Sequence, residues 1–132
     1  MPNVSGVVDV MFGEHDLLEV CKEPFPGLKI ISTGPIPPNP AELLSSGRFA
    51  ELVGQTRRLF DYVLIDSPPT EAVTDPMLIA TQADAVLLVL DSEGTSKASL
   101  RKSIRNLEAV GANVLGTVMN KAPKAETPGY DY

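Results

Sequence analysis

Cysteine, histidine and tryptophan are nearly absent from the 132 residues, which contain one Cys, one His and no Trp. Cys21 has no second cysteine with which to form an intrachain disulfide. Together, Cys21 and His15 cannot complete a tetrahedral zinc site of cysteine and histidine ligands, which needs four residues. Both side chains are therefore expected to pack or to face solvent.

Long apolar runs and positive charge are also missing. The longest continuous apolar run covers residues 85–90, well short of the roughly 18 residues that cross a bilayer. The 17 acidic residues outnumber the 11 basic ones, and the net charge of −6 argues against nucleic acid as a partner. No basic and apolar leader opens the chain. We expect a single acidic domain in the cytoplasm, without membrane insertion.

Four short segments are expected to be strands, at residues 28–32, 62–66, 85–90 and 113–119. The middle two are continuous apolar runs, which are typical of parallel strands covered by helices on both faces. This pattern predicts burial of six side chains: Tyr62, Leu64, Ile65, Leu87, Leu88 and Val89.

Helices are predicted between these strands, at residues 16–22, 40–46, 48–60, 77–82 and 95–110. The longer ones carry an apolar stripe with helical spacing, and the shorter ones follow start signals such as Asn39-Pro40. Alternating strands and helices predict an α/β fold, a three-layer parallel sheet of about four strands with helices on both faces. Right-handed crossovers bring the carboxyl ends of the strands to one edge, where ligands bind.

The carboxyl end of 62–66 carries the most informative candidate residues, Asp66 and Ser67, followed by Pro68-Pro69. An aspartate directly after a buried strand is the Walker B pattern, in which a rigid carboxylate orients the water shell of Mg²⁺. The other interpretation is an aspartate that only stabilises a turn. The two prolines stiffen the exit from the strand and favour the Walker B interpretation.

The stretch Gly34-Pro-Ile-Pro-Pro-Asn-Pro-Ala-Glu-Leu-Leu44 resembles the signature of bacterial protein-tyrosine kinases of capsule and exopolysaccharide synthesis. The spacing to 66–69, the apolar segments at 83–89 and 115–120, and a tyrosine-bearing tail match the same family. The resemblance implies a cytoplasmic, P-loop-NTPase-like module that uses ATP and Mg²⁺. It also implies a kinase or membrane-adaptor partner of polysaccharide synthesis at the inner face of the membrane. If strands of the sheet are missing, an exposed edge favours self-association.

The resemblance implies roles for three residues of the candidate site. Asp66 is then the catalytic residue and holds Mg²⁺ through water, while Asp66, Ser67 and Asn120 bind the nucleotide. An asparagine at the position of Asn120 can read the adenine edge in relatives, and it can equally be a turn residue. Pro123 stands where a guanine-specific Asn-Lys-x-Asp motif has its aspartate, which excludes guanine reading.

The tail at 123–132 is expected to be mobile, beyond a domain at 1–122, because it lacks apolar periodicity and contains Pro128-Gly129. Tyr130 and Tyr132 in this tail are phosphoacceptors by resemblance to the family. Tyr62 is expected to be excluded from that role, because it opens a predicted buried strand.

The family's glycine-rich phosphate loop, which ends in Gly-Lys-Ser/Thr, is missing from this sequence. The backbone amides and lysine of such a loop hold the β and γ phosphates. The chain therefore resembles the C-terminal part of a kinase module that lacks N-terminal strands, with an exposed sheet edge and no activity of its own. One alternative is a non-catalytic interaction or phosphoacceptor module that regulates polysaccharide assembly. A weaker alternative is a relative of septum-positioning ATPases, but the proline-rich stretch at 34–44 argues against it.

Overall fold

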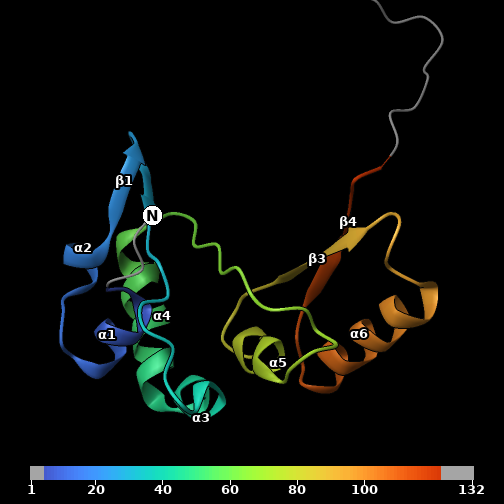
Figure 1. Cartoon of the computed structure of the whole chain (residues 1–132), viewed down its shortest axis with the longest axis horizontal. Coiled ribbons are helices and arrows are strands. Elements are labelled where there is room, and N and C mark those ends of the chain that lie inside the picture. Colours follow the sequence, from blue (N-terminus) through green and yellow to red (C-terminus); the bar gives the residue numbers. More distant parts are fainter. Residues whose placement is uncertain (1–4, 123–132) are drawn as a thin grey trace, which may run out of the picture.

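The computed structural model describes residues 5–122, which form a mixture of helices and strands (Figure 1). The elements are α1 (Val7–Phe12), α2 (Leu17–Val20), β1 (Lys22–Phe25), β2 (Leu28–Ile30), α3 (Pro40–Ser45), α4 (Gly47–Leu59), α5 (Asp75–Ala80), β3 (Val86–Asp91), α6 (Lys97–Ala109) and β4 (Val114–Asn120). All five predicted helices are present, with ends that differ from the predictions by a few residues. The helix α1 and the strand β1 were not predicted.

The limits of the longer helices follow from local sequence signals. Helix α6 begins after Ser96, whose Oγ accepts the backbone N–H of Ser99 at 3.0 Å. It ends just before Gly111, whose positive φ of +76° favours glycine. Helix α3 has Pro40 in its first turn, where the missing N–H costs no helical hydrogen bond.

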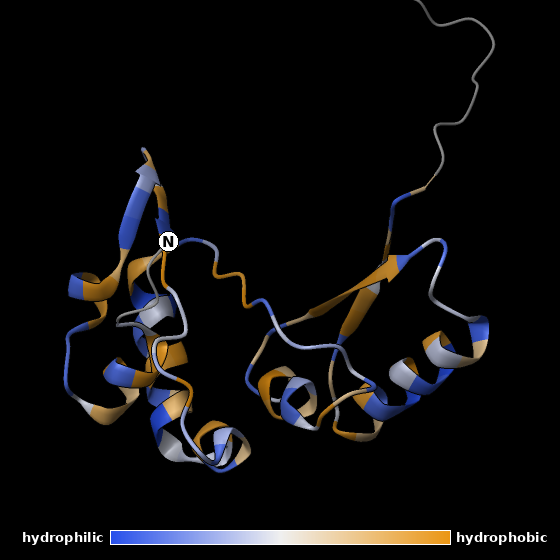
Figure 2. Cartoon of the chain, viewed as in Figure 1, coloured by the Kyte–Doolittle hydropathy of each residue, from blue (hydrophilic) through white to orange (hydrophobic). Residues whose placement is uncertain are grey.

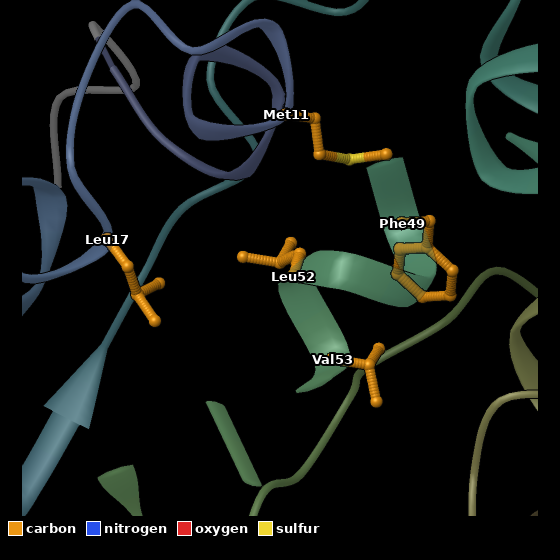
Figure 3. Packing of buried hydrophobic residues seen from close by; sticks show 5 residues of the cluster. All are labelled: Met11, Leu17, Phe49, Leu52 and Val53. Atoms are coloured by element: carbon orange, nitrogen blue, oxygen red, sulfur yellow. The ribbon is translucent and has the colours of Figure 1, made fainter. Parts of the chain in front are cut away.

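The first apolar core lies between α1, α2 and α4. It consists of Met11, Leu17, Phe49, Leu52 and Val53, which are all buried (Figure 3). The three α4 residues are spaced to share one face of the helix, which contacts α1, and Leu17 of α2 belongs to the same cluster. Helices α1 and α2 are too short to be stable alone, so this packing holds them in place.

The second apolar core lies between β3, α5 and α6. It consists of Ala80, Leu88, Leu90 and Leu107. Helix α5 joins the two cores, because Ile79 packs against the first and Ala80 belongs to the second. Strands β3 and β4 pair in parallel and are mostly hydrophobic (Figure 2).

The α/β class with a parallel sheet is confirmed, but the strands form two separate pairs. Strands β1 and β2 are antiparallel, and β3 and β4 are parallel, so residues 5–122 contain no four-stranded sheet. The predicted strand at 28–32 is therefore the second strand of a hairpin. Its tight turn passes through Gly27, which has a positive φ of +81°.

The prediction of a buried strand at 62–66 is wrong. This segment pairs with no other strand of the described chain, and Tyr62 and Leu64 are 91% and 97% exposed. The apolar run favours an extended chain, but a strand also needs a hydrogen-bonded neighbour, and no described segment supplies one.

Burial on both faces of the parallel pair is also not observed. Along β3, Leu88 is 7% exposed, whereas Leu87 and Val89 are 55% and 65% exposed. Successive side chains of a strand point to opposite faces, so the helices cover only one face of β3. The uncovered face and the segment 62–66 together explain the failed burial predictions.

None of the described helices is long and apolar enough to span a bilayer. The predicted tail at 123–132 lies outside the described residues.

One-sided packing of β3 is tested by two leucines that are neighbours in the sequence. Leu88→Ala is expected to lower the free energy of unfolding by about 2–5 kcal/mol, because it leaves a cavity in the second core. The matched control Leu87→Ala should change it by no more than about 0.5 kcal/mol, because that side chain is exposed. Urea titration of both variants measures the difference, and equal losses would show that β3 is covered on both faces.

Candidate functional site

A large open groove of about 1090 Å³ lies between α4, α5, β3 and the extended segment that follows α4. We call it the central groove. Residues 60–71 line one part of it and residues 82–90 line another, with contributions from α5 and α6. The groove exceeds the usual range of about 300–1,000 Å³ for pockets that bind small molecules. Its lining is mostly apolar, with a few polar groups from the 66–71 segment.

An ion pair and two hydrogen bonds connect α4 to the loop that enters β3. The Arg57 guanidinium donates to Asp84 Oδ1 at 2.6 Å and to the Gln82 carbonyl oxygen at 3.2 Å. The Asp84 carbonyl in turn accepts from Asn113 Nδ2 at 3.2 Å. Because Arg57, Gln82 and Asp84 line the central groove, these contacts fix α4 relative to the start of β3.

Asp66 and Ser67, the predicted Walker B residues, both line the central groove. Asp66 is exposed and makes no hydrogen bond or ion pair with another described residue. Ser67 Oγ donates to the carbonyl oxygen of Pro68 at 3.3 Å. The Asp66 carboxylate is therefore accessible, but nothing in the described chain holds it in one orientation.

The described residues contain no cluster of several metal-ligating side chains. No group of three or more His, Cys, Asp or Glu side chains converges anywhere in residues 5–122. Mg²⁺ is usually held by one or two carboxylates together with substrate phosphates and water. Asp66 is one such carboxylate, and a Mg²⁺–nucleotide complex also needs groups that hold its phosphates.

Asn120 ends β4 and is not among the residues that line the central groove. Its side-chain Oδ1 accepts the backbone N–H of Lys121 at 2.9 Å. Lys121 has a positive φ of +56°, a conformation typical of a residue in a tight turn. This contact is compatible with the turn role of Asn120, and of the predicted site residues only Asp66 and Ser67 line the central groove.

The sequence reasoning missed an ion pair at the carboxyl ends of β3 and β4. Lys121 Nζ lies 2.5 Å from Asp91 Oδ2, and Ser92 Oγ donates to the Lys121 carbonyl at 2.7 Å. The hydrogen bond from Lys121 and the backbone N–H of Glu93 hold the pKa of the Asp91 carboxyl below its usual value. Because this pKa is lowered in the fold, the contact stabilises the fold above the ordinary aspartate pKa. The stabilisation is lost as the pH falls through the lowered value.

The segment before the proline-rich stretch is fixed to the start of α1. The backbone amides of Val7 and Val8 donate to the carbonyl oxygens of Ser32 and Thr33, both at 2.9 Å. A Cβ atom at Gly6 would lie only 1.9 Å from the Ser32 oxygen, so the two segments approach too closely for any other residue. This contact sets where the 34–44 stretch leaves the first core.

The three tyrosines fall in two parts of the chain. Tyr130 and Tyr132 lie outside the described residues. Tyr62 lines the central groove and is almost fully exposed, so the expectation that its ring is packed is wrong.

Several curated proteins and solved structures are similar to this chain. CapB of Staphylococcus aureus is 33% identical over 133 residues, which cover 100% of this chain and 58% of CapB. The tyrosine-protein kinase Wzc of Salmonella typhimurium is 33% identical over 98% of this chain and 18% of its own length. The tyrosine-protein kinase CpsD of Streptococcus pneumoniae is 32% identical over 89% of this chain and 52% of its own. No family model matches the chain.

Solved structures share the fold. The kinase domain of the Escherichia coli tyrosine kinase ETK superimposes with a TM-score of 0.87 at 29% identity, over 100% of this chain and 52% of that one. The chimerical protein CapA2B2 also superimposes with a TM-score of 0.87, at 34% identity over 94% of this chain and 55% of its own. The chain thus spans about half the length of the kinase domains it matches.

Proposed function

Since the chain belongs to the family of bacterial tyrosine-protein kinases, we propose that it is part of an ATP-dependent kinase module of capsule or exopolysaccharide synthesis. The observation that carries the proposal is the superposition of nearly the whole chain on about half of each solved kinase domain. The module would work at the cytoplasmic face of the membrane. There it would associate with further copies or with a membrane adaptor.

In this proposal Asp66 is the residue that orients Mg²⁺ through water, and Ser67 lies beside it at the nucleotide. Their place in the central groove supports the assignment, because the groove is large enough for a substrate and both residues are accessible. The remaining phosphate-binding groups must come from elsewhere in the module. Catalysis of phosphoryl transfer depends on positioned phosphates and metal, so the chain alone is inactive.

The first test of this assignment is nucleotide binding by the chain alone. Isothermal titration with ATP and Mg²⁺ is expected to give no saturable heat, because one unsupported carboxylate does not hold a triphosphate. The E. coli ETK kinase domain serves as the positive control, and Asp66→Asn in this chain as the matched variant. A micromolar dissociation constant that is lost in Asp66→Asn would contradict the proposed inactivity of the chain.

The second candidate role is that of a phosphoacceptor. Tyr130 and Tyr132 lie close to acidic residues in the sequence, including Asp131 and Glu126, and the family resemblance makes them the acceptors. Tyr62 is exposed in the structure, so burial does not exclude it. It differs from the other two tyrosines in preceding the apolar run 63–65.

The acceptor role predicts that an intact kinase of the family labels the two C-terminal tyrosines. The chain is incubated with the E. coli ETK kinase domain and ATP, and phosphotyrosine is mapped by mass spectrometry. Most of the label should disappear in the double variant Tyr130→Phe, Tyr132→Phe and remain in Tyr62→Phe. If the label persists in the double variant and is lost in Tyr62→Phe, Tyr62 in the central groove is the acceptor instead.

A further inference from the structure

Helix α6 has a strongly basic surface on a chain that is acidic overall. It holds four of the 11 basic residues of the chain and one of the 17 acidic residues. We call the four basic residues the basic face: they are Lys97, Arg101, Lys102 and Arg105. All four are exposed, while Leu107 on the other side of the helix belongs to the second core. The nucleotide site described above uses none of them.

The fold itself does not neutralise these four cations. No side chain of the basic face forms a hydrogen bond or an ion pair with another described residue. Lys29, Arg57 and Lys121, by contrast, each pair with a carboxylate. The positive charge of the basic face is therefore available to a partner.

The charges of α6 do not help the helix to form. Lys97, Arg101 and Arg105 follow one another at a spacing of four residues, at which like charges destabilise a helix. Lys97 also lies in the first turn and Glu108 in the last, which is the reverse of the arrangement that the helix dipole favours. Helix stability therefore does not explain the basic face, and an external partner does.

The shape of the basic face favours a flat partner. The face is the convex outer side of a helix, and none of its four side chains lines the central groove. Peptides are usually held in a groove or along a strand edge, whereas a lipid bilayer is a surface that all four side chains can contact at once. Clusters of about four to eight Lys and Arg residues on a helix are typical of binding to anionic lipids.

The acidic character of the remaining chain does not prevent this contact. At physiological ionic strength charges are screened over about 8 Å, so carboxylates that lie farther from the lipid contribute little. The nearest acidic residues in the sequence are Glu93 before α6 and Glu108 in its last turn. The other exposed residues of the helix are Ala98, Asn106 and Ala109, which supply no large apolar group for insertion. The contact is therefore electrostatic and confined to the headgroups.

We propose that the basic face of α6 binds an anionic lipid surface. The face is inferred from its own charges, while its location at the inner leaflet of the membrane rests on the proposed function. The guanidinium and ammonium groups contact the lipid phosphates, and the second core then lies next to the bilayer. Because the interaction is between charges in contact with water, it weakens as the salt concentration rises.

The test uses the complete 132-residue chain and vesicles of two compositions. One set contains equal parts of phosphatidylcholine and phosphatidylglycerol, and the other contains phosphatidylcholine alone. In a co-sedimentation assay the chain should bind the anionic vesicles at least about tenfold more tightly than the neutral ones. Raising the salt from about 0.1 M to about 1 M shortens the Debye length from about 10 Å to about 3 Å and should release the chain.

A double variant removes half of the basic face without unfolding the helix. Arg101→Gln with Arg105→Gln should weaken binding to the anionic vesicles at least about tenfold, because each basic residue at such a surface contributes about fivefold. Glutamine is a good helix former, and circular dichroism should show unchanged helix content. The matched control is Arg48→Gln with Arg58→Gln on α4, two exposed residues whose loss changes the net charge equally. It should bind like the unchanged chain.

The outcomes separate lipid binding from its alternatives. Equal binding by the two double variants, or no preference for anionic vesicles, overturns the proposal. If light scattering shows self-association that is lost only in Arg101→Gln with Arg105→Gln, and no vesicle is bound, the partner is a second copy and not lipid. Vesicle binding needs no nucleotide, so its failure leaves tyrosine labelling by the ETK kinase domain unaffected, and failure of that labelling leaves vesicle binding unaffected.

Discussion

The hydrogen bonding of β3 on a single edge is the constraint on which the rest of the structure depends. Its inner face packs on α5 and α6 and forms the second core, and its pairing with β4 accounts for the parallel sheet. Its other face carries no helix among the described residues, so the apolar side chains of Leu87 and Val89 stay exposed.

The elements that the sequence predicts well are those whose stability is local. Helices α4 and α6 carry a clear apolar stripe and recognisable ends, and β3 and β4 are apolar runs bounded by turns. The predicted strand at 62–66 fails because pairing is a property of two segments, and an apolar run does not reveal whether its neighbour is present. Strand β1 and helix α1 were missed because elements of four to six residues carry little periodicity.

The candidate site, like the fold, was predictable only where a local sequence pattern places the residues. Asp66 and Ser67 lie in the groove because the aspartate follows an extended segment that lines it, whatever the pairing of that segment. Asn120 was grouped with them from the family resemblance and from the expectation that the strand ends share one sheet edge. The Asp91–Lys121 ion pair was not foreseen, although Asp91 ends an apolar strand just as Asp66 follows one. Its partner is 30 residues away in sequence, and only the register of β3 and β4 brings the two together.

The most direct measurement is hydrogen exchange of the chain alone at low concentration, followed amide by amide along β3. Our account predicts an alternating pattern: Leu88 and Leu90 are protected by β4, whereas Leu87 and Val89 exchange nearly as fast as the unpaired segment 63–65. Equal protection of all four β3 amides would contradict the account, because both edges of the strand would then be paired without any partner.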